Sequence, residues 1–293
     1  MRLASVIVLS TGQQHAARLE GDDLVLLPYS DVGELLAYDD WRTRAAVEGD
    51  AVGLDRVTLR PVVPSPPKII CMGRNYAAHV AEGGHDLPES PVLFAKHTAS
   101  LTGPYDPIPM PTVSTMLDWE VELAVVVGRA GRAVTKERAL ELVAGYTVSN
   151  DFSVRDWQNR TKQWHAGKAW DGLTPLGPML VTDDEVEPGA TGLSVTCEVD
   201  GEVMQEGNTD QFLFDVATIL ADISVFTRLE PGDVILTGTP SGVGNARNPK
   251  VFLEPGQTVV TRVAGIGELH NVIVEADAEG RPVEEPAETE APA

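Results

Sequence analysis

The chain of 293 residues has two cysteines, 5% aromatic residues and half as many basic as acidic side chains. Cys71 and Cys197 cannot form the disulfide framework of a small secreted domain, so we expect a reducing cytoplasm. With 22 Lys and Arg against 44 Asp and Glu, the formal charge of −22 disfavours nucleic acid and anionic membranes as partners. No apolar run approaches the roughly 18 residues that a membrane-spanning helix needs.

Composition divides the chain into three segments. Residues 1–63 contain short apolar strands at Ser5–Leu9 and Leu24–Leu27, with a helix predicted over Asp31–Glu48. Pro64–Pro67 contains three prolines, which predicts a linker. We therefore expect a small N-terminal domain at 1–63 and a main domain at 68–274. Residues 275–293, with seven acids, one Arg and no large hydrophobe, predict a disordered acidic tail.

Strands follow one another in the main domain without a regular alternation of strand and helix. Thr135 as N-cap and Gly145 past the end predict a short helix at Lys136–Ala144, and apolar residues recur at helical spacing over Phe212–Arg228. Asp200-Gly201 predicts a hairpin turn between two strands. Further strands are expected at Lys68–Met72, Trp119–Val127, Tyr146–Asn150, Asp233–Leu236, Thr258–Val263 and Leu269–Val274. This pattern favours an α+β fold over a doubly wound sheet.

Three carboxylates stand where predicted strands begin or end. On a strand, Glu120 and Glu122 share one face and lie about 7 Å apart, and the same face continues with apolar residues. Two such carboxylates need a cation to offset their repulsion and desolvation. Asp151 follows the next strand, and an all-oxygen set of this kind suits Mg²⁺, Mn²⁺ or Ca²⁺ better than Zn²⁺. The alternative is an edge strand with ordinary solvent-facing glutamates.

A histidine and a glutamate lie three residues apart after the first strand of the main domain. If Tyr76–Glu82 is helical, His79 and Glu82 share one face and can form a hydrogen bond. A carboxylate beside an imidazole fixes its tautomer and raises its basicity, as a general base requires. Gly83-Gly84 would give this segment a flexible end, typical of a lid. The alternative is an exposed helical turn with an incidental pair.

Taken together, the motifs of residues 68–274 resemble the fumarylacetoacetate hydrolase family. They occur in order as GRNYAAHVAE (Gly73–Glu82), PVLFAKHTASLTGP (Pro91–Pro104), DWEVELAVVVG (Asp118–Gly128), SNDFSVRDWQ (Ser149–Gln158), GKAWDGLTPLGP (Gly167–Pro178) and LTGTPSGVG (Leu236–Gly244). The resemblance implies a mixed β-roll catalytic domain behind a small N-terminal α/β domain, dependence on Mg²⁺ or Mn²⁺, and a homodimer. The chain has no counterpart of the early aspartate ligand of animal fumarylacetoacetases. It looks closer to the acylpyruvase, fumarylpyruvate hydrolase and hydroxyheptadienedioate isomerase branch.

The resemblance also implies roles for individual residues. The metal ligands fall on Glu120, Glu122 and Asp151, and the water-activating pair on His79 and Glu82. Lys168 matches the catalytic lysine, although by itself it would be interpreted as a surface lysine. The positions that match substrate-binding residues are Arg74, Lys96, Arg155, Gln158, Gly238 and Thr239.

These roles imply a hydrolase that cleaves the C–C bond of a 2,4-dioxo acid, of the acylpyruvate or fumarylpyruvate type. The metal would stabilise a pyruvate enolate while His79, oriented by Glu82, activates water. The same enolate chemistry could instead serve an isomerase acting on a dienol carboxylate such as 2-hydroxyhepta-2,4-diene-1,7-dioate, or an oxaloacetate-type decarboxylase. A metal-dependent ligand-binding module without turnover is the alternative from another class.

Overall fold

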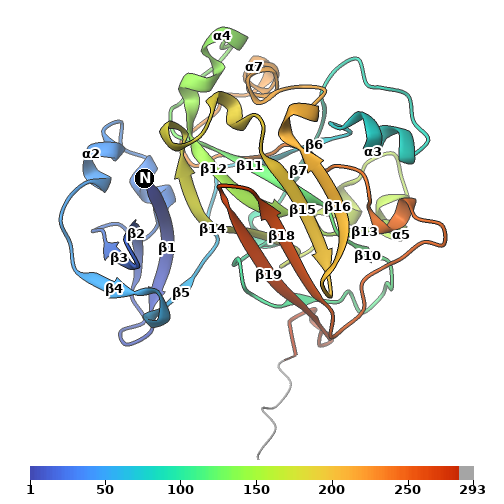
Figure 1. Ribbon diagram of the computed structural model, residues 1–293, viewed down its shortest axis with the longest axis horizontal. Helices are drawn as coiled ribbons and strands as arrows, with labels where there is room; N and C mark the ends of the chain where they lie inside the picture. The colour runs from blue at the N-terminus through green and yellow to red at the C-terminus, as the bar shows by residue number, and fades with distance from the viewer. Residues whose placement is uncertain (284–293) are drawn as a thin grey trace, which may run out of the picture.

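The computed structural model describes residues 1–283, in which an N-terminal group of strands lies beside a larger body (Figure 1). The predicted disorder of the last residues falls in part on 284–293, which lie outside the described residues. Within 275–283 the chain makes a turn in which Arg281 pairs with Asp277. No helix among residues 1–283 is long and apolar enough to cross a membrane.

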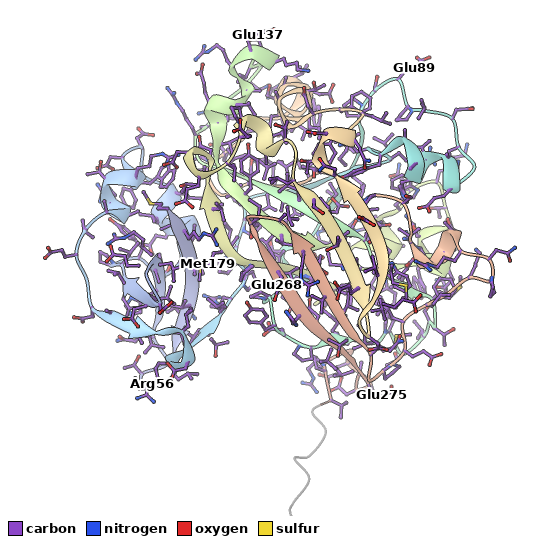
Figure 2. All side chains as sticks on the ribbon, viewed as in Figure 1. Arg56, Glu89, Glu137, Met179, Glu268 and Glu275 are labelled. Carbon is purple, nitrogen blue, oxygen red and sulfur yellow. The ribbon has the colours of Figure 1, made fainter. Side chains whose placement is uncertain are left out.

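The N-terminal segment forms one end of the largest sheet. Its elements are β1 (Arg2–Val8), β2 (Gln14–Glu20), β3 (Asp23–Leu26), β4 (Ala51–Gly53) and β5 (Val57–Leu59), with α1 (Val32–Leu36) and α2 (Trp41–Ala45). Met179, in a strand of the body, packs against Ala4, Val6 and Leu24 at the junction of the two parts (Figure 2). The domain boundary at the proline-rich stretch stays a prediction, since the sheet runs through both parts.

The large sheet continues through the body. It has twelve strands, in the order β4-β3-β2-β1-β14-β12-β11-β17-β6-β7, with β5 paired to β1 and β8 to β14. The body strands are β6 (Ile69–Gly73), β7 (Val92–Lys96), β8 (Leu101–Thr102), β11 (Val121–Val127), β12 (Val143–Asn150), β14 (Thr174–Thr182) and β17 (Val234–Leu236). Most neighbours are antiparallel, but β17 and β6 are parallel, and so are β14 and β8.

A second sheet covers the body on the side that faces the viewer in Figure 1. Its order is β16-β15-β18-β19-β9. The strands are β9 (Ile108–Pro109), β15 (Ser194–Val199), β16 (Glu202–Asn208), β18 (Thr258–Val263) and β19 (Gly267–Val274), and a separate pair is formed by β10 (Leu117–Asp118) and β13 (Ser153–Val154). The predicted Asp200-Gly201 hairpin joins β15 to β16, with both residues at positive φ.

The helices are short and lie at the ends of strands. They are α3 (Ala77–Glu82), α4 (Lys136–Ala139), α5 (Arg155–Gln158), α6 (His165–Lys168) and α7 (Val216–Phe226), with 3-10 turns at Leu54–Arg56, Thr98–Ser100, Leu140–Leu142, Asp183–Glu185, Pro188–Ala190, Thr209–Gln211 and Gly244–Ala246. Few helices beside two sheets give the α+β class that the sequence predicts.

Three of the predicted helices are wrong in extent. The helix expected over 31–48 is split into two short helices. Asp31 caps the start of α1, and the Asp39-Asp40 pair interrupts the helical conformation before α2 begins. The helix expected over 136–144 ends after one turn at Ala139, because Val143 already pairs with β11. The helix expected over 212–228 begins at Val216, where Asp215 accepts a hydrogen bond from the Thr218 amide.

Strand β11 is buried on both faces, and this explains why its start can carry a site. Leu123 and Val125 pack in the main core, whereas Ala124 and Val126 pack in a second core shared with the N-terminal segment. Burial of branched side chains on both faces stabilises the strand by about 2 kcal/mol per residue. The carboxylates at its beginning are therefore attached to a rigid support.

Candidate active site

A cavity of about 580 Å³ opens beside the start of β11. Its wall combines the β6–α3 segment, the α5–α6 region and the loop after β17. Eight of the predicted site residues line it: Arg74, His79, Glu82, Glu120, Arg155, Gln158, Lys168 and Thr239. The other four predicted residues are not among the lining residues: Asp151 pairs with Lys168 of the lining, Lys96 pairs with Asp151, and the Gly238 amide donates to Glu122.

The three predicted metal-ligand carboxylates converge. Glu120, Glu122 and Asp151 are at most 5% exposed, and each offers an oxygen within 4.8 Å of those of the other two. Glu120 lies just before β11 and not within it, where its amide donates to the Asn150 side chain at 2.9 Å. The Asp151 amide in turn donates to the Glu120 carbonyl at 2.9 Å. Backbone pairing between β11 and β12 thus brings Asp151 to the two glutamates.

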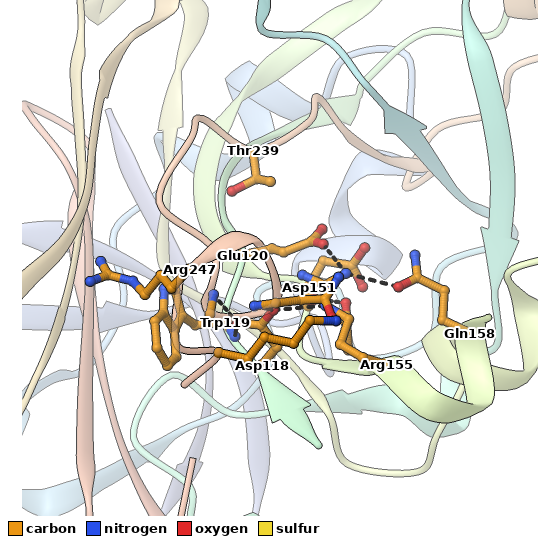
Figure 3. A network of polar contacts seen from close by, with 12 residues as sticks. Asp118, Trp119, Glu120, Asp151, Arg155, Gln158, Thr239 and Arg247 are labelled. Atoms are coloured by element: carbon orange, nitrogen blue, oxygen red, sulfur yellow. Dashed lines mark hydrogen bonds and ion pairs between the residues drawn. The ribbon is translucent and has the colours of Figure 1, made fainter. Parts of the chain in front are cut away.

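Buried cations compensate two of these carboxylates. Lys168 Nζ lies 2.7 Å from Glu120 Oε2 and 2.8 Å from Asp151 Oδ2, while Lys96 donates to the other oxygen of Asp151. Arg155 lies 2.7 Å from Glu120 Oε1 (Figure 3). Burial raises the pKa of Glu120, but Lys168 and Arg155 outweigh this effect and lower it to about 2. Glu120 is therefore ionised across the physiological range.

The third carboxylate, Glu122, has no cationic side chain against it among residues 1–283. Its Oε2 accepts a hydrogen bond from the Gly238 amide at 2.6 Å. Burial, and then the charges of Asp151 and Glu120, raise its pKa well above the usual range. A buried carboxylate without a compensating charge is costly, and a divalent cation between these oxygens would remove that cost. The donor set is all oxygen, so the residues fit Mg²⁺ or Mn²⁺.

The predicted His79–Glu82 pair exists and faces the cavity. His79 Nδ1 lies 2.7 Å from Glu82 Oε1, on helix α3 as the spacing predicts. Their side chains are 19% and 20% exposed. The Gly242 amide donates to the second oxygen of Glu82 at 2.9 Å. Because Nδ1 faces the carboxylate, Nε2 of His79 is the ring atom available to a substrate.

The loop after β17 completes the cavity with a hydroxyl and backbone amides. Thr239 is 3% exposed, and its Oγ1 accepts a hydrogen bond from the Gln205 side chain at 2.8 Å. Gln205 also accepts from the Val121 amide at 3.0 Å, which joins the loop to β11. The Thr239 hydroxyl hydrogen is therefore free to point toward a ligand.

An arginine and a tryptophan form the rim. The Arg74 guanidinium lies 5.4 Å from the centre of the Trp164 ring, and Arg74 adopts φ 58°, which is rare for a residue other than glycine. Trp164 covers Gly73 so closely that a Cβ there would lie 2.4 Å from the indole. Gln158 accepts a hydrogen bond from Arg155 at 2.9 Å, so these two side chains are engaged with each other.

Sequence reasoning missed several residues that support the site. Asp118 accepts from Arg155 and from the amides of Gly244 and Asn245. Asn75 lies inside a motif that we singled out, but its side-chain role was not predicted: it donates to the Thr237 carbonyl at 2.7 Å. Gln205 carries no local signal, because its role depends on the packing of β16 against the loop after β17.

Comparisons with known protein sequences find relatives of this chain. The model of the fumarylacetoacetate (FAA) hydrolase C-terminal domain matches residues 68–274. Human oxaloacetate tautomerase FAHD2A, mitochondrial, is 45% identical over 220 residues, covering 74% of this chain and 70% of that protein.

Solved structures are similar over almost the whole chain. The fumarylacetoacetate hydrolase of Exiguobacterium antarcticum is 34% identical, with a TM-score of 0.82, and the match covers 94% of this chain and 99% of that one. The 2-hydroxyhepta-2,4-diene-1,7-dioate isomerase of Mycobacterium marinum is 32% identical with a TM-score of 0.77, covering 94% and 98%.

The fold and the acidic site define an enzyme class with a buried carboxylate centre and a histidine dyad. The chain belongs to the fumarylacetoacetate hydrolase family. The predicted family and the predicted α+β fold are thus confirmed. For the reaction, the relatives named as a tautomerase and an isomerase favour the alternative that the sequence left open over C–C hydrolysis.

Proposed function

We propose that this enzyme transfers a proton at the carbon next to the carbonyl of a 2-oxo acid with a second carboxylate, as in the tautomerisation of oxaloacetate. The observation that carries the proposal is that the His79–Glu82 dyad and Glu120, one of the three clustered carboxylates, line the same cavity. A base beside a cation-binding centre is what enolisation needs, because the proton leaves while negative charge develops on oxygen. The tautomerase and isomerase relatives support the same reaction type.

Glu120, Glu122 and Asp151 would hold Mg²⁺ or Mn²⁺. A divalent cation would supply positive charge to stabilise the enolate oxygens and to orient the 2-oxo carboxylate. The role of this chain is to hold the ligands in place, and the backbone pairing and buried cations around them do so.

The proton-transfer role falls to His79 and not to Lys168. Burial lowers the pKa of Lys168, but Asp151 and Glu120 outweigh it and raise the pKa above its usual range, so Lys168 stays charged and acts as a donor. Glu82 orients the imidazole, which leaves Nε2 free to accept the proton from the carbon next to the carbonyl and to deliver it to the enolate oxygen. Arg74 and the Thr239 hydroxyl would bind the substrate carboxylates.

C–C hydrolysis of a 2,4-dioxo acid is the second candidate, favoured by the exposure of the dyad. Because both side chains keep contact with solvent, His79 could take its proton from a water molecule. Decarboxylation of oxaloacetate would need no such water.

One assay separates these reactions. The enol absorbance of oxaloacetate and of acetylpyruvate is followed in the near ultraviolet with enzyme, with Mg²⁺ or Mn²⁺ and with excess chelator, and pyruvate is measured in parallel. Metal-dependent loss of the oxaloacetate enol without pyruvate supports tautomerisation. Release of pyruvate from acetylpyruvate would contradict tautomerisation and indicate C–C hydrolysis. Release of pyruvate from oxaloacetate would indicate decarboxylation instead. No change with either substrate would contradict the proposal.

We also propose a homodimer in the cytoplasm. The location rests on Cys71 and Cys197, which are both buried and unpaired, as in reducing compartments. The human relative is named as mitochondrial, so fractionation of the source cells tests the compartment and sedimentation tests the dimer.

A further inference from the structure

The loop from Gly238 to Arg247 contacts both halves of the site through its own amides. The Gly238 amide donates to Glu122 at 2.6 Å, and the Gly242 amide donates to Glu82 at 2.9 Å. One is a carboxylate of the buried centre and the other belongs to the dyad on α3. The loop therefore connects the two parts that must act together.

Helix α3 is attached to the body differently at its two ends. At its start, the Asn75 side chain accepts from the Phe214 amide at 2.8 Å and donates to the Thr237 carbonyl at 2.7 Å. At its end, the amides of Gly83, Gly84 and His85 bond within the same helical turn. Among residues 1–283, the Glu82–Gly242 hydrogen bond is the polar contact that joins this end to the body.

Gly242 is itself held in place by two side chains. Trp119 Nε1 donates to the Gly242 carbonyl at 3.2 Å, and Arg247 Nε donates to the same oxygen at 3.4 Å. Arg247 Nη2 also donates to the Met204 carbonyl at 2.8 Å, which anchors the loop to β16. Gly242 has φ +107°, and a Cβ there would lie 2.2 Å from the Met204 oxygen. Only glycine allows this approach.

We propose that Trp119 and Arg247 are positioning residues that fix Gly242, and through it Glu82 and His79. The Glu82 carboxylate has both oxygens engaged, one with His79 and one with Gly242, so its plane is set by the loop. Without that second contact, Glu82 can rotate into solvent and His79 loses its orientation. The part of the proposal that concerns turnover rests on the proposed role of His79 as the base.

The first test compares two glycines with similar backbone strain. Gly242→Ala places a Cβ against the Met204 carbonyl, whereas Gly256→Ala, at φ +91°, has nothing within 4 Å. Hydrogen exchange of residues 77–85 is measured by mass spectrometry without substrate. We expect Gly242→Ala to speed exchange about tenfold or more, as loss of a hydrogen bond to a charged group implies, and Gly256→Ala to leave it unchanged.

The second test removes one donor and keeps the packing. Trp119→Phe loses the indole N–H that holds Gly242, whereas the matched control Trp157→Phe loses a buried indole N–H that has no hydrogen-bond partner within residues 1–283. We expect Trp119→Phe to speed exchange in 77–85 and to lower kcat about tenfold with KM unchanged. Because Trp119 precedes Glu120, the affinity for Mn²⁺ alone is measured too and should match that of the unchanged protein.

Unchanged exchange in both Gly242→Ala and Trp119→Phe would overturn the proposal. A loss of Mn²⁺ affinity in step with kcat in Trp119→Phe would also overturn it, because Trp119 would then act through Glu120. Exchange and Mn²⁺ binding need no substrate, so these results stand even if the enzyme proves to be a hydrolase.

Discussion

The carboxylate centre and helix α3 face the same cavity, but they are built in opposite ways. Glu120, Glu122 and Asp151 are buried at the adjoining ends of the paired strands β11 and β12, and three buried cations pair with Glu120 and Asp151. His79 and Glu82 are partly exposed on a helix of six residues, and one hydrogen bond joins its end to the body. Buried charged networks are rigid and sensitive to the loss of any member, whereas an exposed turn can open and close at low cost.

This contrast separates what each part supplies. The centre should determine metal affinity and contribute to folding, whereas the dyad should determine the rate of proton transfer. Substitutions in the two parts should therefore differ in which quantity they change.

The largest effect is expected for Glu120→Ala. Metal-dependent turnover should become undetectable, and the free energy of unfolding should fall by about 3–5 kcal/mol because Lys168 and Arg155 lose a buried partner. Urea denaturation and the enol assay measure the two quantities. Undiminished turnover would remove Glu120 from the ligand set.

Glu122→Gln should abolish metal binding as well, yet leave the metal-free protein at least as stable. The amide keeps an oxygen for the Gly238 N–H and replaces a carboxyl group whose charged form is disfavoured by burial and by the charges of Asp151 and Glu120. Calorimetric titration with Mn²⁺ and urea denaturation in chelator check both parts. A large loss of stability in the metal-free protein would contradict this prediction. Glu122 would then stabilise the fold through its charge, as Glu120 does.

His79→Ala should lower kcat by about 10²–10⁴, the usual contribution of general acid–base catalysis. Its Mn²⁺ affinity should change little, because the hydrogen bond of the imidazole within residues 1–283 goes to Glu82 and not to one of the three carboxylates. Steady-state kinetics and Mn²⁺ titration measure this split. If Mn²⁺ binding is lost instead, His79 belongs to the centre.

Glu82→Gln should have the smallest effect of the four, about tenfold on kcat, as is typical when an orienting partner is altered. The amide can still contact both the imidazole and the Gly242 N–H, although not with full negative charge. The free energy of unfolding, measured by thermal denaturation, should change by less than about 1 kcal/mol, since the side chain is partly exposed. A kcat as low as that of His79→Ala would show that the dyad acts as one unit.

Local spacing predicted those parts of the site that depend on one element. The i, i+3 spacing of His79 and Glu82 predicts their contact because both lie on one helix. The i, i+2 spacing of Glu120 and Glu122 likewise predicts neighbouring carboxylates, although Glu120 lies outside the strand.

Contacts between distant segments could not be predicted in this way. Lys96 reaches Asp151 because β7 pairs with β6, which in turn pairs with β17. Gln205 reaches the loop after β17 from β16 of the second sheet, and Trp119 reaches it from the segment between β10 and β11. The same limit applies to the fold, where helix extents were wrong at Asp39-Asp40 and Val143 because capping and strand pairing outweighed helical periodicity.

The packing of Trp164 on Gly73 has a practical consequence for following this enzyme. The indole lines the cavity, contacts Phe94 edge to face at 5.6 Å between ring centres, and lies under Arg74. A ligand that binds the Arg74 guanidinium and moves it off the ring changes the polarity around the indole, and therefore the emission wavelength and intensity of its fluorescence. Occupancy of the cavity can thus be read optically in a stopped-flow instrument, with inert analogues as well as with molecules that react.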